Sequence, residues 1–531
     1  MENMNGESRT SRHDNGALPS KHGRLEGNGS SDVTMKKIAK LQELQENMIR
    51  QMDEQFKEIV GHMVEGIDNV DHVNHFHYDN AKYSNRAKSS KDGKLSDKIF
   101  LARESLLTDL FQIKHFYTIY NIFIAILIIL FLNTAVYDIV STGTLNLGLS
   151  LIQWNFGKFH IFFLMWILMM IGTVGVYCSM HFWAHYRKEY YGKSASRKAW
   201  DYGWLGLYII YQVIFGIWPV AQVLKYNLPP ASSMALLMEQ VRLIMKSHAF
   251  VRSNIPRALT YKPHSEQDEK KLIPEFGHFL YFLFVPTLVY RDSYPRTHKI
   301  SWHKVIWHFL EVVGVIFYVS FIFERFLVPL FNQYGVKHFG PEHLVVSIFG
   351  SMMPATLAFL CAFFGLLHSW MNAFAEMTRF ADRMFYKDWW NANSYAEYYR
   401  MWNLVVHDWL YTYIFKDYCL LIKSKSRLGP TLTVFIVSAI VHEYILMFVF
   451  RFFYPLLFVA FGGFSAALVF LTGSSSKRGN LFMWLTLCLG TGVLTAAYSM
   501  EWYARINCPQ VLDTVTDFFV PRSWFCNAVK Q

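Results

Sequence analysis

The sequence is poor in charged residues for a protein of its length. Asp, Glu, Lys and Arg make up only 17% of its 531 residues, whereas they form roughly 25% of ordinary soluble domains. Hydrophobic side chains make up 53% of the chain and aromatic ones 17%. Apolar runs near the roughly 20 residues needed to cross a bilayer recur along the sequence. This pattern excludes an ordinary soluble domain and predicts an all-α, polytopic membrane protein.

Three further features are missing from the sequence. No Cys and His spacing suits a zinc site, and no glycine-rich loop is placed to hold phosphates. We therefore expect neither a metal nor a permanently bound cofactor. No cleavable signal peptide is visible, because the first hundred or so residues are polar. The net charge of +11 lies mostly beside the apolar runs, which fits cytoplasmic loops and anionic headgroups better than nucleic acid.

The order of polar and apolar stretches divides the chain into five predicted parts. They are a disordered cytoplasmic tail, an amphipathic oligomerisation helix, a cytoplasmic linker with an interfacial helix, a transmembrane domain and a luminal tail, at residues 1–34, 35–67, 68–117, 118–500 and 501–531. In the second part, Ile38, Leu41 and Met48 recur at helical steps between polar residues. This seam favours self-association over a helix that lies on the membrane or on its own core.

The apolar runs predict about nine transmembrane helices. They lie at about 118–140, 160–180, 202–224, 233–252, 303–331, 344–369, 429–450, 453–472 and 480–500. The fourth is weak, because Glu239, Arg242 and Lys246 interrupt it. Lys and Arg are concentrated in the loops after the second and eighth spans. The positive-inside bias therefore places the N-terminus in the cytoplasm and the C-terminus in the lumen.

Two of the six cysteines differ from the rest in their surroundings. Cys508 and Cys526 lie in the polar tail after the last span, whereas the other four lie in or near apolar runs. The predicted topology places the tail in an oxidising lumen, where disulfides form and persist. We predict a disulfide between these two cysteines, with two free thiols as the alternative.

One histidine, His442, stands inside an apolar run, in the sequence Val-Ser-Ala-Ile-Val-His-Glu-Tyr-Ile. A histidine at bilayer depth is costly unless it lines a cavity or does chemistry. A neutral imidazole in a site of low dielectric is a capable general base. The alternative is a structural histidine that bonds a neighbouring helix. The polar and aromatic segments that precede His442 favour the catalytic interpretation.

A charge-flanked aromatic cluster, Phe-Tyr-Lys-Asp-Trp-Trp-Asn, occupies residues 385–391, and a second polar segment follows it. In that segment Asn403 and His407 are four residues apart, so they share one face if the segment is helical. An asparagine amide can donate a hydrogen bond to a developing oxyanion; capping a helix is the alternative role. The cations Lys423, Lys425 and Arg427 either hold the phosphates of an anionic cosubstrate or follow the positive-inside bias.

The cluster Phe385–Asn391 and the His-Glu-Tyr context of His442 carry a family resemblance. The chain resembles the sterol O-acyltransferases, the acyl-CoA:cholesterol acyltransferase branch of the membrane-bound O-acyltransferase family, from about Phe100 to Cys526. The diacylglycerol acyltransferase branch shares both features. The stretches Arg-Asp-Ser-Tyr at 291–294 and His-Asp-Trp-Leu-Tyr at 407–411, with the cysteine pair, look like the sterol branch instead.

The resemblance implies an activity. A long-chain fatty acyl group would pass from acyl-CoA, the cosubstrate, to the 3β-hydroxyl of cholesterol in the endoplasmic reticulum membrane. His442 would deprotonate the hydroxyl and Asn403 would help to hold the thioester. The resemblance also implies the membrane-bound O-acyltransferase fold and a homo-oligomer, dimer or tetramer, with 35–67 matching the oligomerisation helix. A polytopic sterol-binding or transport protein is the other class to exclude.

By matched position, the resemblance implies further site residues. Trp402 would lie beside the reacting centre, and His368 is a pocket candidate. The acyl-CoA path would be lined by Arg400, His407, Tyr411, Phe415, Arg427 and Ser438. The signature residues would shape the cytoplasmic entrance, with Asp388 as a structural hydrogen-bond partner: Phe385, Tyr386, Asp388, Trp389, Trp390 and Asn391. Asn121 stands where a histidine associated with sterol contact is common, which weakens any expectation of a sterol site beside the first span.

Overall fold

The computed structural model describes residues 95, 97–145, 149–190, 194–260, 272–337, 339–423, 426–472 and 478–526. The chain divides into two units, Met1–Ser96 and Asp97–Gln531, and the fold below is that of the second. Its described residues form helices joined by loops, with isolated β-bridges in place of sheets. The all-α prediction is confirmed. The predicted tail 1–34 and amphipathic helix 35–67 lie outside the described residues.

Among the described residues, seven helices are long and apolar enough to cross a membrane. They are α3 (Lys114–Thr142), α5 (Phe159–Arg187), α6 (Ser194–Lys225), α9 (Trp302–Ile322), α11 (Pro341–Phe363), α16 (Leu428–Phe450) and α19 (Gly479–Asn507). Two continue through π-helical turns, α9 into η2 (Phe323–Leu327) and α11 into η3 (Phe364–Trp370). A polytopic membrane protein is therefore confirmed, with seven such helices rather than the nine predicted.

The two remaining predicted spans correspond to elements that differ from an apolar membrane helix. The stretch 453–472 forms a shorter apolar segment, Leu456–Leu471, built from α17 (Leu456–Phe458), η6 (Val459–Ser465) and α18 (Ala466–Leu471). The stretch 233–252 lies in α7 (Pro230–Thr260). Its charged residues Glu239, Arg242 and Lys246 are the ones that weaken its prediction as a membrane span.

The charges of α7 serve contacts inside the protein. Arg242 pairs with Glu239 at 2.6 Å and donates to the Leu283 carbonyl. Lys246 is fully buried and donates to the Val285 carbonyl at 2.7 Å. These carbonyls belong to the end of α8 (Phe276–Phe284), where cations complement the negative end of the helix dipole. The helix is therefore built to pack against protein, which an apolar-run criterion does not detect.

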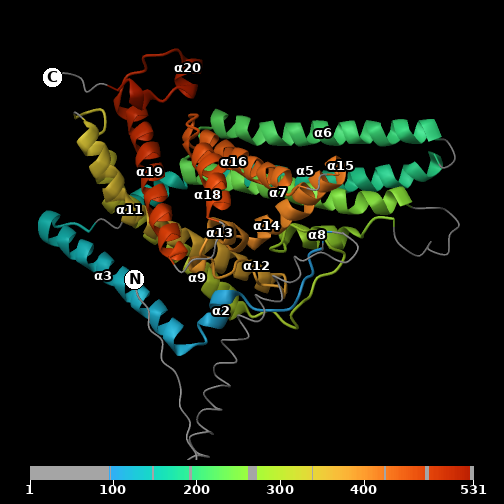
Figure 1. Ribbon diagram of the computed structural model, residues 1–531, viewed down its shortest axis with the longest axis horizontal. Helices are drawn as coiled ribbons and strands as arrows, with labels where there is room; N and C mark the ends of the chain where they lie inside the picture. Colours follow the sequence, from blue (N-terminus) through green and yellow to red (C-terminus); the bar gives the residue numbers. More distant parts are fainter. Residues whose placement is uncertain are drawn as a thin grey trace, which may run out of the picture. The chain divides into compact units, whose positions relative to one another are not determined.

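The helices pack in two groups (Figure 1). Helices α5, α6 and α7 extend together to one side, and α16 packs against α7. Helices α11 and α19 lie side by side on the other. They approach closely at Gly492, where an added Cβ would lie 3.0 Å from the Ile348 carbonyl and would collide with Met352. Glycine permits this close backbone approach because it has no side chain.

The C-terminal tail folds back on the end of α19, through α20 (Thr514–Phe519) and η7 (Arg522–Trp524). The predicted disulfide between Cys508 and Cys526 is present. Beside it, the buried Asp517 carboxylate accepts from Arg505 at 3.1 Å and from Arg522 at 2.6 Å. The tail is therefore held to the last transmembrane helix by one covalent bond and a cluster of ion pairs.

Candidate functional site

His442 lies in the middle of α16, and its Nδ1 atom is 2.7 Å from the Ser438 carbonyl oxygen, one turn earlier. A carbonyl can only accept, so Nδ1 carries the proton and the neutral ring keeps its lone pair on Nε2. Within the described part of the chain, Nε2 makes no hydrogen bond, and the residue is exposed. The helix therefore fixes the tautomer that a general base needs and leaves the basic nitrogen accessible. The same bond brings Ser438 next to His442.

The ring of His442 faces a layer of aromatic side chains. Its centroid lies 5.4 Å from that of Phe461 in η6. Phe461 and Phe435 each lie 5.2 Å from Tyr399, which belongs to α13 (Tyr395–Met401). The adjacent Glu443 is buried, and its Oε2 accepts from the Phe458 backbone nitrogen at 3.1 Å. This layer was missed at the sequence level, where only the His-Glu-Tyr context gave a signal.

Asn403 caps the N-terminus of α14 (Leu404–Leu410). Its Oδ1 accepts from the Val406 backbone nitrogen at 3.1 Å. Over the ranges that the structure covers, Nδ2 makes no hydrogen bond. The capping role and the donor role therefore do not compete, because they use opposite ends of one amide. The cap also fixes the direction in which the Nδ2 hydrogens point.

The signature cluster Phe385–Asn391 lies against the break between α13 and α14. The Leu404 nitrogen donates to the Phe385 carbonyl, and the Lys387 nitrogen donates to the Met401 carbonyl, both at 2.8 Å. These two bonds flank Asn403 in the chain. Backbone hydrogen bonds of this kind hold the non-helical residues between two helices in one conformation. The signature therefore positions the segment that carries Asn403.

Three aromatic side chains of the signature are interior. Phe385, Tyr386 and Trp389 are all 1% exposed or less. Trp389 lies 4.7 Å from Trp402, centroid to centroid, and Trp402 stacks on Phe359 of α11 at the same distance. Trp402 is thus held between the signature and α11, next to Asn403 in the chain.

The rest of the signature bonds through its backbone. The Trp390 carbonyl accepts from Asn480 at 2.8 Å and from Trp484 at 3.1 Å. The Asp388 carbonyl accepts from the Asn391 nitrogen at 2.9 Å. In the part of the chain that the structure describes, the Asp388 carboxylate makes no hydrogen bond. The bonding of Asp388 is therefore through its main chain.

His368 lies in η3 and is buried in a polar network. Its Nδ1 is 2.7 Å from the Tyr386 hydroxyl and 3.3 Å from both Ser105 Oγ and Asn372 Nδ2. Because the Asn372 Nδ2 group can only donate, and the Tyr386 and Ser105 hydroxyls can also donate, Nδ1 is the acceptor in this network. His368 thereby connects α11 to the signature. π-Helical turns such as η3 often occur at functional sites.

His407 lies one turn after Asn403 on α14 and is half-buried. Its buried Nδ1 has no hydrogen bond among the described residues and lies 3.8 Å from Asp408 Oδ1. Burial works to raise the pKa of Asp408, but the neighbouring His407 and the Lys98 ammonium hold that pKa below its usual range. Further along, Tyr411 stacks on Phe415 at 5.4 Å in η5 (Tyr411–Phe415). His407, Tyr411 and Phe415 therefore lie along one helical segment.

The cations predicted to bind phosphate or to line the acyl-CoA path lie, where the structure describes them, at exposed helix ends. Arg400 is in the last turn of α13, Lys423 ends α15 (Lys416–Ile422) in a left-handed conformation, and Arg427 precedes α16. All three are exposed, and Lys425 lies outside the described residues. Exposed cations can bind phosphate without first breaking a buried ion pair. Within the described ranges, no group of three or more His, Cys, Asp or Glu side chains is placed to hold a metal ion.

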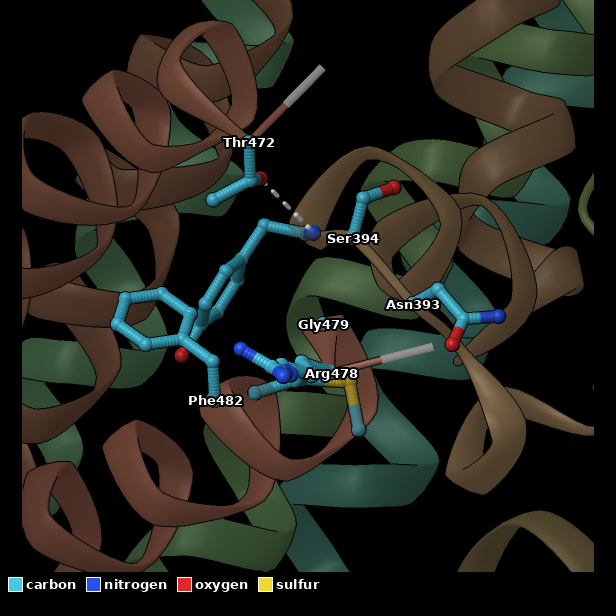
Figure 2. Close-up of a pocket in the computed structure, with 8 residues that line it drawn as sticks. Asn393, Ser394, Thr472, Arg478, Gly479 and Phe482 are labelled. Carbon is cyan, nitrogen blue, oxygen red and sulfur yellow. Dashed lines mark hydrogen bonds between the residues drawn. The ribbon is translucent and has the colours of Figure 1, made fainter. Parts of the chain in front are cut away.

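A small cavity of about 260 Å³ lies away from these residues. Figure 2 shows Asn393 and Ser394 of the loop before α13 opposite Thr472, Arg478 and Phe482. None of the predicted site residues lines it. The cavity borders the stretch 473–477, which is outside the described residues, and we assign it no role.

Comparison with known proteins gives one family model and several individual relatives, and all of them are acyltransferases. Residues 149–500 match the model of MBOAT, the membrane-bound O-acyltransferase family. Sterol O-acyltransferase 1 of Mus musculus is 44% identical over 452 residues, covering 84% of this chain and 83% of the relative. The same protein of Chlorocebus aethiops is 41% identical, covering 94% and 93%. Sterol O-acyltransferase 2 of Homo sapiens is 39% identical, covering 81% and 80%. The resemblance drawn from the sequence motifs is confirmed.

Proposed function

The chain belongs to the membrane-bound O-acyltransferase family, and from this premise we propose that it transfers a long-chain fatty acyl group from acyl-CoA to the 3β-hydroxyl of cholesterol. The products are cholesteryl ester and CoA. The observation that carries the proposal is the His442 tautomer, with Nδ1 bonded to the Ser438 carbonyl and Nε2 left basic. The sterol acceptor is supported by the names of the similar proteins.

His442 acts first as a general base. Its Nε2 takes the proton of the sterol hydroxyl as that oxygen attacks the thioester carbonyl carbon. The Ser438 carbonyl accepts from Nδ1 throughout, so it stabilises the positive charge that forms on the ring. When the carbon–sulfur bond breaks, Nε2 returns the proton to the CoA thiolate. The thioester is already activated, so no acyl-enzyme is required.

Asn403 stabilises the charge that develops on the thioester oxygen. Its Nδ2 hydrogens donate to the oxyanion, while Oδ1 remains bonded in the cap of α14. A donor that is fixed before the reaction stabilises the transition state without a cost of reorganisation. The backbone bonds from the signature to Met401 and Leu404 supply that fixed position.

Acyl-CoA reaches this centre from the cytoplasmic side. The exposed cations Arg400, Lys423 and Arg427 bind its phosphates, and the acyl chain passes His407, Tyr411 and Phe415. The support is their exposure at helix ends, together with the strength of charge-assisted bonds to phosphate. No permanently bound cofactor is involved; acyl-CoA is a cosubstrate.

We assign the protein to the endoplasmic reticulum membrane, with the N-terminus cytoplasmic and the C-terminus luminal. The disulfide between Cys508 and Cys526 supports the position of the tail, since disulfides persist in oxidising compartments. A homo-oligomer, dimer or tetramer, remains the expected assembly, with residues 35–67 as the candidate contact.

The test uses the purified full chain in detergent with labelled oleoyl-CoA and either cholesterol or diacylglycerol. We expect cholesteryl ester, and we expect His442→Ala to lose about 10²- to 10⁴-fold in kcat, the usual contribution of a general base. The matched control is His185→Ala, an exposed histidine of α5, which should keep full activity. Triacylglycerol as the product would move the protein to the diacylglycerol branch, and undiminished activity of His442→Ala would exclude His442 as the base. Absence of transfer to either acceptor by folded protein would favour a binding or transport role.

A further inference from the structure

Residues 97–104, here named the strap, precede α2 (Leu106–Leu110) in the chain and are the blue trace that leads into α2 in Figure 1. Two basic residues of the strap form a chain of ion pairs. Lys98 Nζ lies 2.7 Å from Asp408 Oδ2 and 4.0 Å from Asp382 Oδ2. Arg103 Nε lies 2.6 Å from Asp382 Oδ1. The Lys98 and Asp382 side chains are only 13% and 2% exposed, so solvent screens these pairs little.

The strap also pairs through its backbone. The Arg103 nitrogen donates to the Ala381 carbonyl at 2.8 Å, and the Arg383 nitrogen donates to the Arg103 carbonyl at 3.0 Å. The strap therefore lies beside residues 381–383, which lead directly into the signature at Phe385. It touches the site from two directions, since Asp408 is on α14 and Asp382 precedes the signature.

We propose that Lys98 is a positioning residue for acyl-CoA binding, which acts by holding Asp408 and thereby α14. The inference rests on the proposed function, in which Asn403 and His407 contact the cosubstrate. Asp408 directly follows His407 and lies five residues after Asn403. A cation fixed on Asp408 restrains the helix on which both residues stand. Neither Lys98 nor Asp408 is in the predicted set of site residues.

Loss of Lys98 has two consequences in the same direction. The helix α14 loses its ion pair with Lys98 of the strap, so the side chains of Asn403 and His407 are less well placed. The Asp408 carboxylate, 24% exposed, loses its cation close to the path of a polyanionic cosubstrate. A half-buried carboxylate without a partner repels phosphate and is costly in itself. Both effects weaken acyl-CoA binding, and neither acts on the sterol.

The strap contains a matched control for this proposal. Asp97 Oδ1 lies 2.6 Å from Lys416 Nζ, a distance close to that of the Lys98 pair. The Asp97 side chain is 75% exposed, and Lys416 begins α15, which continues α14 through η5 and lies farther along the chain from Asn403 than Asp408 does. Asp97→Asn therefore removes an ion pair of the same segment without leaving a negative charge beside the proposed path.

The experiment compares the parent, Lys98→Met, Lys98→Arg, Asp97→Asn and the double variant Lys98→Met/Asp408→Asn in detergent. It measures KM for oleoyl-CoA, KM for cholesterol, the Kd of a non-hydrolysable oleoyl thioether of CoA, and thermal unfolding. We expect Lys98→Met to raise KM and Kd for the CoA compounds about tenfold, within the 5- to 150-fold range of typical couplings. KM for cholesterol should stay near the parent value. Lys98→Arg and Asp97→Asn should bind as the parent does.

The double variant separates positioning from folding. Removal of the Asp408 charge should recover part of the affinity lost in Lys98→Met, because paired residues give non-additive effects. The proposal is overturned if Lys98→Met leaves CoA affinity unchanged, if it raises both KM values alike, or if the double variant binds the CoA compounds no more tightly than Lys98→Met. If the parent makes no cholesteryl ester, the proposed function fails. The Kd ratio of parent to Lys98→Met still decides the role of Lys98.

Discussion

Asn403 offers a test in which folding and chemistry are separable, because the two ends of its amide have different partners. Oδ1 caps α14 through the Val406 nitrogen, and Nδ2 is the proposed oxyanion donor. Asn403→Asp keeps an acceptor for the cap and removes both donor hydrogens. Asn403→Ala removes both functions. The difference between the variants therefore isolates the donor.

The expected magnitudes follow from these two roles. Loss of one oxyanion donor costs about 2.7–4 kcal/mol in the barrier, or about 10²- to 10³-fold in kcat. Asn403→Asp should reach the upper end of that range, because the carboxylate also repels the developing negative charge. Its stability should be close to that of the parent, since a helix N-terminus favours an acidic cap. Asn403→Ala should lose similar activity and about 1 kcal/mol of stability as well.

The assay is acyl transfer from labelled oleoyl-CoA to cholesterol, with thermal unfolding measured on the same preparations. Ser394→Ala is the matched control, because Ser394 caps α13 through the Glu397 nitrogen at 3.2 Å and has no proposed chemical role. It should lose about 1 kcal/mol of stability and retain most of kcat. The reasoning is refuted if Asn403→Asp keeps a kcat close to the parent value, or if Asn403→Ala loses no more activity than Ser394→Ala.

Three further predictions concern stability and are read from thermal unfolding. Gly492→Ala should cost about 1–3 kcal/mol by overpacking against α11, whereas Gly490→Ala on the same helix meets nothing within 4 Å and should be neutral or stabilising; equal effects would contradict the packing. Gly335→Ala should destabilise more than Gly143→Ala, because both have positive φ but only the former would collide with the disulfide sulfurs. Burial works to raise the pKa of Asp517, but Arg522 and Arg505 lower it below its usual range. Its contribution to stability should therefore be complete above about pH 4 and lost as the pH falls further through the lowered folded-state value. Asp517→Asn should be less stable than the parent near neutral pH, and the two should converge in acid.

The features that the sequence predicted best are those set by local composition. Apolar runs identified the seven helices of the described residues that are long and apolar enough to cross a membrane, because length and hydropathy determine whether a helix can cross a bilayer. The disulfide followed from two cysteines in one polar tail. The fourth predicted span shows the limit of this reasoning, because its charges bond to the end of α8 through residues some 40 positions away. The sequence pattern of α7 alone therefore does not predict that these carbonyls are its partners.

The site was predicted unevenly for the same reason. His442 and Asn403 were predicted as site residues because their residue types and surroundings point to chemistry, and their roles stay predictions. The tautomer of His442 needs a carbonyl one turn earlier, which any helix provides. In contrast, Lys98 and Asp408 are 310 positions apart, and no local sequence pattern in either segment predicts that they pair. Likewise, the aromatic layer at His442 joins three separate elements, and only the fold reveals it.

The structure suggests why a buried aromatic cluster marks this site although it does no chemistry. Asn403 stands at the break between α13 and the helical run that begins with α14, and α13, with seven residues, is weakly held by its own hydrogen bonds. The break keeps its conformation because Phe385 and Lys387 bond to its backbone on either side of Asn403. Trp389 fills the space behind Trp402. An oxyanion donor must be held to a fraction of an ångström, so the cluster supplies the rigidity that the broken helix lacks. On this argument, the signature marks the site because it holds Asn403, the proposed oxyanion donor, in position.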